Sequence, residues 1–273
     1  MKNILSIDVE DWYHGLFSLS GFTINPSKDR VRQEVNLLFD FLKRKNTIGT
    51  IFILGEIVEK YPDIVQKFFK HGFEIGVHTY SHKRVNQMTP LEFSEDLKKC
   101  KDVINNAIAV NPVGFRAPAF SINHDMNWAF EILCQEGFKF DSSLFPTLNP
   151  LYGDIKSPLT PFSICNSFGS IKEFPMSTLN IMGVPFPVAG GFYLRALPLW
   201  IVEWGIKQCN ENGYPFILYM HPWEIDPKQT KPSLINNRER ITHYYNVKNT
   251  LKKLDYLLEK YEFTSFEHYE AER

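Results

Sequence analysis

The sequence has little of what marks several large classes of protein. Only four of its 273 residues are cysteines, they are widely scattered, and none belongs to a Cys-x-x-Cys pair: Cys100, Cys134, Cys165 and Cys209. This spacing gives no support to a disulfide framework or to a cysteine zinc site, so we expect reduced, mostly buried thiols. The net charge of −1 provides no broad electrostatic attraction toward nucleic acid or anionic membranes.

Long apolar segments are also missing. No stretch reaches the roughly 18 uninterrupted apolar residues that a membrane-spanning helix needs. The apolar run at the start of the chain is short and is interrupted by Asp8, which does not fit a secretory signal. From these features, together with the reduced cysteines, we expect a cytoplasmic protein.

What the sequence does contain is an alternation of two apolar patterns. Short buried runs of strand type alternate with segments in which apolar residues recur at helical spacing. Predicted strands cover residues 4–9, 48–54, 73–78, 113–115, 138–141, 171–174 and 216–220, and predicted helices cover residues 26–44, 62–70, 90–107, 125–135, 197–212 and 247–260. Residues 144–170, rich in Pro, Ser and Asn, read as a long excursion.

Strands that alternate with helices predict an α/β fold with a mainly parallel sheet and right-handed crossovers. The number of alternations favours a barrel over an open sheet. No internal repeat, low-complexity run or linker-like change of composition interrupts the chain, so we expect residues 1–273 to form a single domain.

Polar residues follow five of the predicted strands directly. Catalytic groups gather at the carboxyl ends of strands in such folds, so this sorting indicates one shared site. The residues are Asp8 and Glu10, His78 and His82, Arg116, Asp141, and His221.

His78 and His82 are four residues apart, a spacing that places two imidazoles on one face of a helical turn, where they can share a metal ion. Two unrelated histidines are the alternative. The acidic run Asp8-Val-Glu10-Asp11 supplies carboxylates for a third ligand and a general base, unless it is a solvated acidic turn. In an extended segment Asp8 and Glu10 point to the same side, so they are the natural partners, with Asp11 as the rival ligand.

Two further residues have a chemical and a structural interpretation. Arg116 could form a two-pronged ion pair that holds Asp8 ionised, or a purely structural salt bridge. His221 follows a strongly apolar strand and is well placed as a general acid, although a satisfied core histidine is the simpler alternative.

The chain resembles the NodB-type polysaccharide deacetylases, carbohydrate esterases that remove N-acetyl groups. Five motifs, spread from about residue 3 to residue 266, carry the resemblance: SIDVED, HTYSH, FRAPAFS, FDSS and LYMHPWE. The DVEDW opening and the HPWEIDP ending are similar to those of the subgroup found with bacterial exopolysaccharide and O-antigen gene clusters. One departure stands at Val9, because the commonest family opening has two adjacent aspartates. Glu10 fits the variant in which a later carboxylate binds the metal.

The resemblance implies a distorted (β/α) barrel of about seven parallel strands and a divalent metal, commonly Zn²⁺. The implied roles are then assigned by matching position: Glu10, His78 and His82 as metal ligands, Asp8 as base, Arg116 as the residue that orients it, His221 as acid and Asp141 as its support.

The predicted activity is hydrolysis of the N-acetyl group of an amino sugar in a polysaccharide or glycan precursor. Trp12, Phe120 and Trp223 lie beside the motifs and could form the walls of a sugar groove, or could simply pack in the core. The cluster formed by His243, Tyr244 and Tyr245 has no predicted place. Two alternatives stay open: a C–N hydrolase acting on a ureide or formamide, and a non-catalytic carbohydrate-binding protein.

Overall fold

The computed structural model describes residues 1–14, 30–149, 152–229 and 237–272. Its strands are β1 (Asn3–Val9), β2 (Thr50–Ile53), β3 (Glu74–Val77), β4 (Gly114–Phe115), β5 (Phe140–Asp141), β6 (Phe162–Asn166), β7 (Gly169–Glu173), β8 (Thr178–Ile181), β9 (Val184–Pro187), β10 (Ile217–Met220) and β11 (Phe263–Thr264). A nine-stranded sheet has the order β10-β1-β2-β3-β4-β5-β7-β6, with β11 paired to β1, and β8 and β9 form a separate hairpin.

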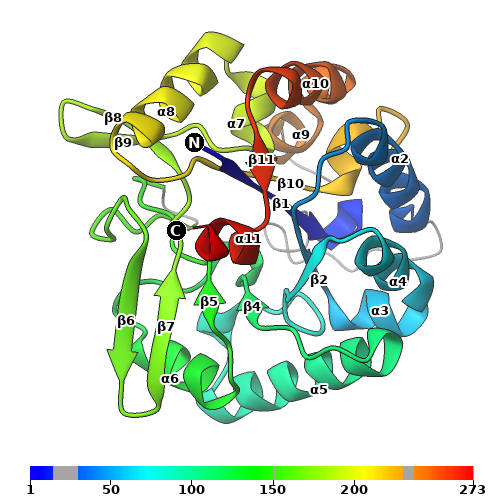
Figure 1. Cartoon of the computed structure of the whole chain (residues 1–273), viewed down its shortest axis with the longest axis vertical. Helices are drawn as coiled ribbons and strands as arrows, with labels where there is room; N and C mark the ends of the chain where they lie inside the picture. The colour runs from blue at the N-terminus through cyan, green and yellow to red at the C-terminus, as the bar shows by residue number, and fades with distance from the viewer. Residues whose placement is uncertain (15–29, 150–151, 230–236, 273) are drawn as a thin grey trace.

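The helices lie around this sheet (Figure 1). They are α2 (Val31–Arg44), α3 (Gly55–Lys60), α4 (Pro62–Lys70), α5 (Pro90–Ile108), α6 (Asn127–Gln135), α7 (Gly191–Ala196), α8 (Leu199–Glu211), α9 (Asn237–Tyr244), α10 (Thr250–Lys260) and α11 (Phe266–Ala271). Short 3₁₀ turns are η2 (Val85–Gln87), η3 (Pro118–Phe120), η4 (Pro222–Ile225) and η5 (Val247–Asn249).

The α/β fold with a mainly parallel sheet is confirmed. Seven strands follow one another in parallel along the sheet from β10 to β7, and only the β6–β7 pair is antiparallel. Within the described part of the chain, the ladder from β10 to β6 is not joined end to end by a strand pair. The parallel order places the carboxyl ends of β1, β3, β4, β5 and β10 at the same edge of the sheet.

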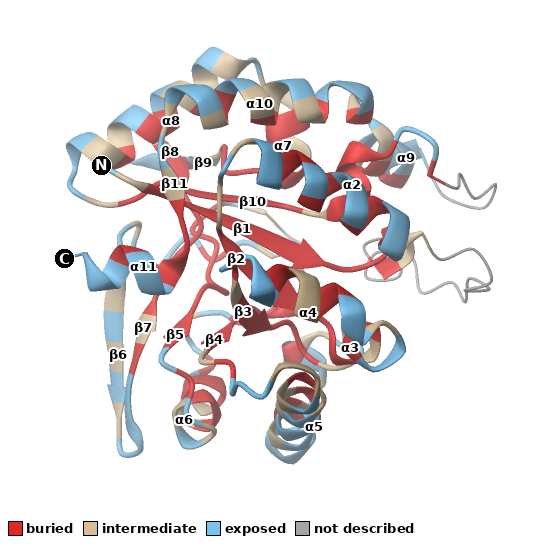
Figure 2. Cartoon of the chain, turned by 45° about the vertical axis from the view of Figure 1, so that its right-hand side comes forward, coloured by how far each residue is buried: buried red, intermediate tan, exposed pale blue. Residues whose placement is uncertain are grey.

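Burial explains why these segments form strands and helices. All seven residues of β1 are buried, as their apolar run predicts, and Figure 2 shows the strands buried beneath helices whose outer faces are exposed. Helix α2 buries Val31, Val35, Leu38 and Leu42, which recur at helical spacing. Helix α5 begins with the predicted capping box, in which Thr89 and Glu92 accept each other's backbone N–H.

The sequence prediction was less complete in the second half of the chain. Residues 144–170 contain strand β6, which pairs with β7 as a hairpin. The β8–β9 hairpin and helices α7, α9 and α11 were not predicted, and the helix predicted over residues 247–260 begins with the 3₁₀ turn η5. The first residues of the helix predicted over 26–44 lie outside the described residues.

The second half of the chain is part of the central sheet. Strand β10 pairs in parallel with β1, the first strand, with Ile4 opposite Ile217 and Ile7 opposite Met220.

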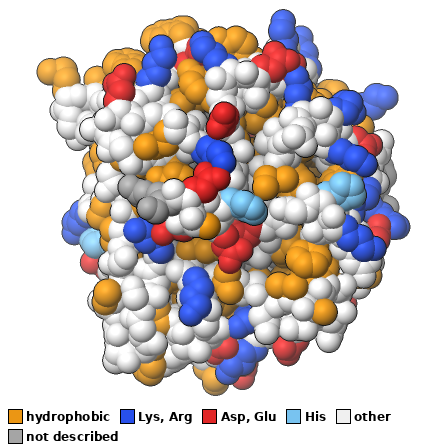
Figure 3. Space-filling model, in the orientation of Figure 1, with side chains coloured by type: hydrophobic (Ala, Val, Ile, Leu, Met, Phe, Trp, Pro, Cys, Tyr) orange, Lys and Arg blue, Asp and Glu red, His pale blue; other side chains and the backbone are white. Residues whose placement is uncertain are grey.

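On the face drawn in Figure 3, lysines and arginines are interspersed with acidic side chains and form no broad basic area. In the described residues, no helix is long and apolar enough to cross a bilayer.

Candidate active site

A cavity of about 470 Å³ opens where the parallel strands end. Its walls combine ionisable groups with aromatic rings. The lining residues are Asp8, Glu10, His78, His82, Arg84, Ala117, Ala119, Phe120, Asn149, Tyr152, Gly191, Phe192, Tyr193, Arg195, Tyr219, His221, Trp223, Arg238, Glu239, Thr242 and His243.

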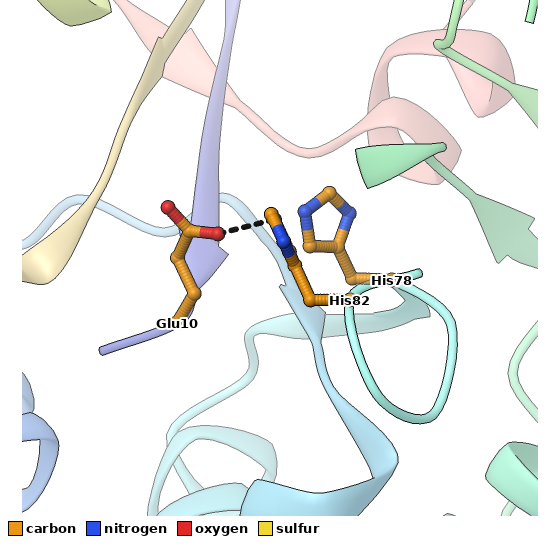
Figure 4. A group of neighbouring side chains, drawn as sticks. All are labelled: Glu10, His78 and His82. Carbon is orange, nitrogen blue, oxygen red and sulfur yellow. Dashed lines mark ion pairs between the residues drawn. The ribbon is translucent and has the colours of Figure 1, made fainter. Parts of the chain in front are cut away.

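Glu10, His78 and His82 form the group of side chains in this cavity that could hold a metal ion. One ligand atom from each residue lies within 4.8 Å of the others, and all three residues are buried. Figure 4 shows that Glu10 comes from the end of β1, whereas both histidines come from the loop after β3 and point toward it. Two imidazoles and one carboxylate are a common donor set for Zn²⁺ and related divalent ions.

The protonation state of His78 suits a metal ligand. Its Nδ1 lies 2.7 Å from the backbone oxygen of Arg116, so Nδ1 carries the proton and Nε2 presents its lone pair. Burial lowers the pKa of His78 to about 4, which keeps the imidazole neutral near pH 7. A neutral imidazole with one oriented lone pair is what metal binding requires.

The carboxylate of Glu10 also suits a cation site. Burial raises its pKa, but His82 and His221 lower it by more, so the group stays ionised. Its Oε2 is buried and lies 2.5 Å from Nε2 of His82. Two buried ligand atoms this close together can share one cation, and buried charged oxygens need such a partner.

The loop that carries the histidines is not the helical turn that their spacing predicted. Thr79 and His82 both have left-handed backbone conformations, with φ of 64° and 62°. The amides of Gly55 and Glu56, at the start of α3, donate to the carbonyls of Thr79 and Tyr80, while Asp96 on α5 accepts from the amide of Tyr80 at 2.8 Å. These contacts hold a strained loop in the shape that turns both rings inward.

Arg116 holds Asp8 at the end of β1. Its Nη1 donates to Asp8 Oδ1 at 2.8 Å and to Ser6 Oγ at 2.8 Å, while Nε and Nη2 donate to the backbone and hydroxyl oxygens of Ser142. The described ion pair thus uses one guanidinium nitrogen, where the sequence predicted two. Because both side chains are buried, the pair fixes the position of Asp8.

His221 lies between two carboxylates. Its Nδ1 is 2.7 Å from Glu224 Oε1, and its Nε2 is 3.5 Å from Glu10 Oε1. Burial alone would lower the pKa of His221, but Glu10 and Glu224 outweigh burial and raise the pKa to about 9. His221 is therefore a cation near pH 7, with Nε2 facing the cavity.

Glu224 is in turn held by Arg195. The guanidinium Nε donates to Glu224 Oε2 at 2.7 Å, and the remaining nitrogens donate to backbone carbonyls at the end of α9 and just after it. Both residues are buried, so each charge needs the opposite charge of its partner to offset the loss of hydration. The cavity thus gathers a possible metal site, a carboxylate held by arginine, and a protonated histidine.

This combination agrees with what the sequence is similar to. The family model described as polysaccharide deacetylase matches residues 26–133, and a second model, described as a domain of unknown function (DUF3473), matches residues 142–271. Residues 26–133 are therefore similar to the polysaccharide deacetylases. A peptidoglycan-N-acetylglucosamine deacetylase of Bacillus cereus is 34% identical over 95 residues, which are 34% of this chain and 34% of that protein. The chain therefore spans about a third of the length of this curated relative.

Solved structures share the fold of this chain. A Mycobacterium smegmatis protein assigned to the polysaccharide deacetylases has a TM-score of 0.59 at 19% identity, with 80% of this chain and 76% of that one covered. A CE4 family pseudoenzyme from Bacillus anthracis has a TM-score of 0.51 at 14% identity, with 98% and 65% covered. Because the fold is shared with a pseudoenzyme, the activity has to be argued from the site.

Asp11, the rival third ligand, has other partners in the structure. Its carboxylate accepts from the backbone N–H of Trp12 at 2.8 Å, of Arg30 at 3.0 Å and of Val31 at 3.2 Å. These bonds cap the start of α2, and burial raises the pKa of Asp11 to about 6. Glu10 is therefore the carboxylate that faces the histidines.

Asp141 does not support His221. It lies behind the cavity wall, where its Oδ1 accepts from the Ser143 hydroxyl at 2.6 Å. Burial raises the pKa of Asp141 and raises that of the adjacent Glu173 well above its usual range, so the two carboxyl groups share a proton. The support predicted for Asp141 is provided by Glu224, three residues after His221.

The three predicted sugar-binding aromatics divide into two groups. Phe120 and Trp223 are among the described cavity-lining residues, whereas Trp12 is not. Trp12 is buried and packs against Trp223. The prediction that Trp12 lines the groove is therefore wrong. The hydrophobic effect accounts for this outcome, because a large ring beside a buried strand is removed from water more often than it is displayed.

Several cavity residues were missed in the sequence. Arg195 could have been found as a cation inside an apolar segment, which requires a buried partner, and Glu224 is visible three residues after His221. His243, for which the sequence predicts no place, lines the cavity. Tyr152 and Tyr193, whose hydroxyls are 2.9 Å apart, carry no local signal.

A pH profile tests the pairing of His221 with Glu224. In Glu224→Gln the negative charge that stabilises the imidazolium is lost, so the pKa of His221 falls. We expect the alkaline limb of activity to move to lower pH by about one unit, the size of a lost charged hydrogen bond. Glu131→Gln, on α6 away from the cavity, is the matched control. If the alkaline limb of the pH profile is unchanged in Glu224→Gln, His221 is not the acid whose titration sets that limb.

Proposed function

We propose that this chain is a metal-dependent hydrolase that removes the N-acetyl group from an amino sugar. The observation that carries the proposal is the content of one cavity: the Glu10, His78 and His82 cluster, Asp8 held by Arg116, and cationic His221. These are the parts that hydrolysis of an unactivated amide requires, namely an electrophile site, a base and an acid.

The donor set favours Zn²⁺ as the resident ion. When bound, such an ion polarises the amide carbonyl and makes water a stronger nucleophile at neutral pH. Glu10, His78 and His82 would hold it at the wall of the cavity. The second nitrogen of His78 is already tied to the backbone of Arg116, which orients its ring for this role.

Asp8 is the proposed base. Arg116 holds it at the cavity wall, where it accepts a proton from water as the water oxygen attacks the amide carbon. The new C–O bond produces a tetrahedral oxyanion, and breakage of the C–N bond then releases acetate.

His221 is the proposed acid. As an imidazolium, it donates a proton from Nε2 to the departing nitrogen, so that the amine leaves neutral. Glu224 and Arg195 hold the ring in place from behind through Nδ1, which leaves Nε2 as the nitrogen that transfers the proton.

The cavity walls support a sugar as the substrate. Aromatic rings of Phe120, Tyr152, Tyr193 and Trp223 surround the polar groups, and sugar rings pack well on aromatic faces. The relative from Bacillus cereus is named for action on N-acetylglucosamine in peptidoglycan. We extend the substrate class, an N-acetylated amino sugar, to this chain, and we propose that its two matched segments act as one catalytic domain.

Release of acetate tests the substrate class. The zinc-loaded protein is incubated with N-acetylglucosamine oligomers, with a cyclic ureide and with a formamide, and the products are quantified. We expect acetate and free amine from the sugar alone. Hydrolysis confined to the small amides would overturn the sugar assignment, and sugar binding without turnover on any acetylated sugar would identify a binding protein. The cytoplasmic location stays a prediction that cell fractionation tests.

A further inference from the structure

The part of the chain matched as a domain of unknown function contributes more than half of the described residues that line the cavity. His221, Trp223, Arg195, Tyr193 and His243 all lie within residues 142–271 and all line it. This contribution is built into the fold, because β10, which ends just before His221, pairs with β1, which ends just before Glu10. Residues 142–271 therefore meet the first strand of the chain at the proposed metal site.

We propose that residues 142–271 complete the metal centre, and that Trp223 is the positioning residue of the metal ligand Glu10. The inference rests on the proposed metal site and assigns a specific task to the segment of unknown function. It concerns how the ligand is held, so metal affinity can test it separately from catalysis.

The first argument is the hydrogen bond between the two residues. The indole Nε1 of Trp223 donates to Glu10 Oε1 at 3.2 Å, while Oε2 of the same carboxylate faces His82. An indole N–H can only donate, so the contact distinguishes the two oxygens and directs Oε2 toward the histidines. A bond from a partner behind the ligand is the usual way in which a metal-binding side chain is oriented.

The second argument is that the indole cannot easily turn away. Its ring is stacked between His221, at 4.9 Å and 17°, and His243, at 4.1 Å and 11°. Trp12 packs against it within the same buried cluster. A ring held on several sides keeps its N–H in one direction, which is what a positioning residue needs.

The third argument is that this clamp is itself supported. Nε2 of His243 lies 2.7 Å from the amide oxygen of Gln229, and the Gln229 amide nitrogen donates to the backbone oxygen of Trp223 at 3.1 Å and to that of Asp226 at 3.2 Å. Arg195 binds the backbone oxygen of His243 and the carboxylate of Glu224. The turn η4, α9 and α7 thus form one connected scaffold behind Glu10.

The glycines before α7 show that this scaffold is pressed onto the sheet. Gly190 has φ of 105°, and a Cβ there would lie 1.8 Å from the backbone oxygen of Tyr219 in β10. Only glycine permits this approach, which brings α7 and Arg195 against the strand that carries His221. This close backbone contact therefore holds residues 142–271 against the strand that ends at the proposed metal site.

The test compares Trp223→Phe with Trp128→Phe, a change of the same kind on α6, where Trp128 packs against Phe93. Phenylalanine keeps an aromatic ring in the stack and removes the N–H. Zinc affinity is measured by competition with a chromophoric chelator, and thermal stability is recorded alongside. We expect Trp223→Phe to weaken zinc binding by about 10-fold or more, as loss of a ligand's supporting bond commonly does, with no change in Trp128→Phe.

A double-mutant cycle separates positioning from general destabilisation. In a Glu10→Asp background a carboxylate remains for zinc, but the side chain is one methylene shorter and loses its bond to Trp223, so Trp223→Phe should cause no further loss of zinc affinity. Equal losses in both backgrounds, or a Trp223→Phe protein that binds zinc as tightly as the wild type, would overturn the inference. Wild-type protein that binds no zinc would overturn the proposed function itself, a distinguishable result.

Discussion

Asp8→Asn is expected to lower kcat by about 10²–10⁴-fold, the usual contribution of a positioned general base. Asparagine has nearly the same shape and still accepts the hydrogen bond from Arg116, but it cannot take a proton from water. Bound zinc should remain stoichiometric, because Asp8 is outside the Glu10, His78 and His82 group. Steady-state acetate release on an N-acetylglucosamine oligomer, with zinc content measured on the same sample, gives the result.

The control is Asp102→Asn, which makes the same chemical change on the exposed side of α5. Loss of the Asp8 charge also leaves the buried Arg116 without its counter-ion, so the melting temperature is measured for both variants. A folded, zinc-loaded Asp8→Asn protein with a normal rate would show that the base is another group.

His78→Ala is expected to remove the metal and, with it, activity. The imidazole supplies one of three protein donors, and two donors seldom retain a divalent ion against a chelator. Zinc per chain, measured after equilibrium dialysis, should fall from about one toward zero. His71→Ala, an exposed histidine at the end of α4, should keep a full complement of metal. One zinc per chain in the folded His78→Ala protein would contradict the ligand assignment.

Much of this site is predictable because of one property of parallel sheets. Asp8, His78, Arg116 and His221 each follow a short apolar run, and the carboxyl ends of parallel strands meet at one edge. The strand positions alone therefore predict that these residues lie close together at one edge of the sheet. The strand assignments were reliable because strands such as β1 and β2 are buried along their whole length and are mostly apolar.

The supporting contacts were not predictable in the same way. Whether Asp141 or Glu224 supports His221 depends on side-chain directions within a few residues of each strand end. The sequence could not show that Asp141 turns toward Ser143, or that a 3₁₀ turn returns Glu224 to His221. The left-handed conformation of His82 is equally invisible, since it is imposed by contacts with α3 and α5.

The most direct test of the central claim is the position of the metal. Crystals grown with Zn²⁺ and measured at the zinc absorption edge show it as an anomalous difference peak. We expect one peak per chain, about 2.0–2.2 Å from Nε2 of His78, Nε2 of His82 and one carboxylate oxygen of Glu10. No peak between these three side chains, or a peak bound by Asp11 in place of Glu10, would contradict it.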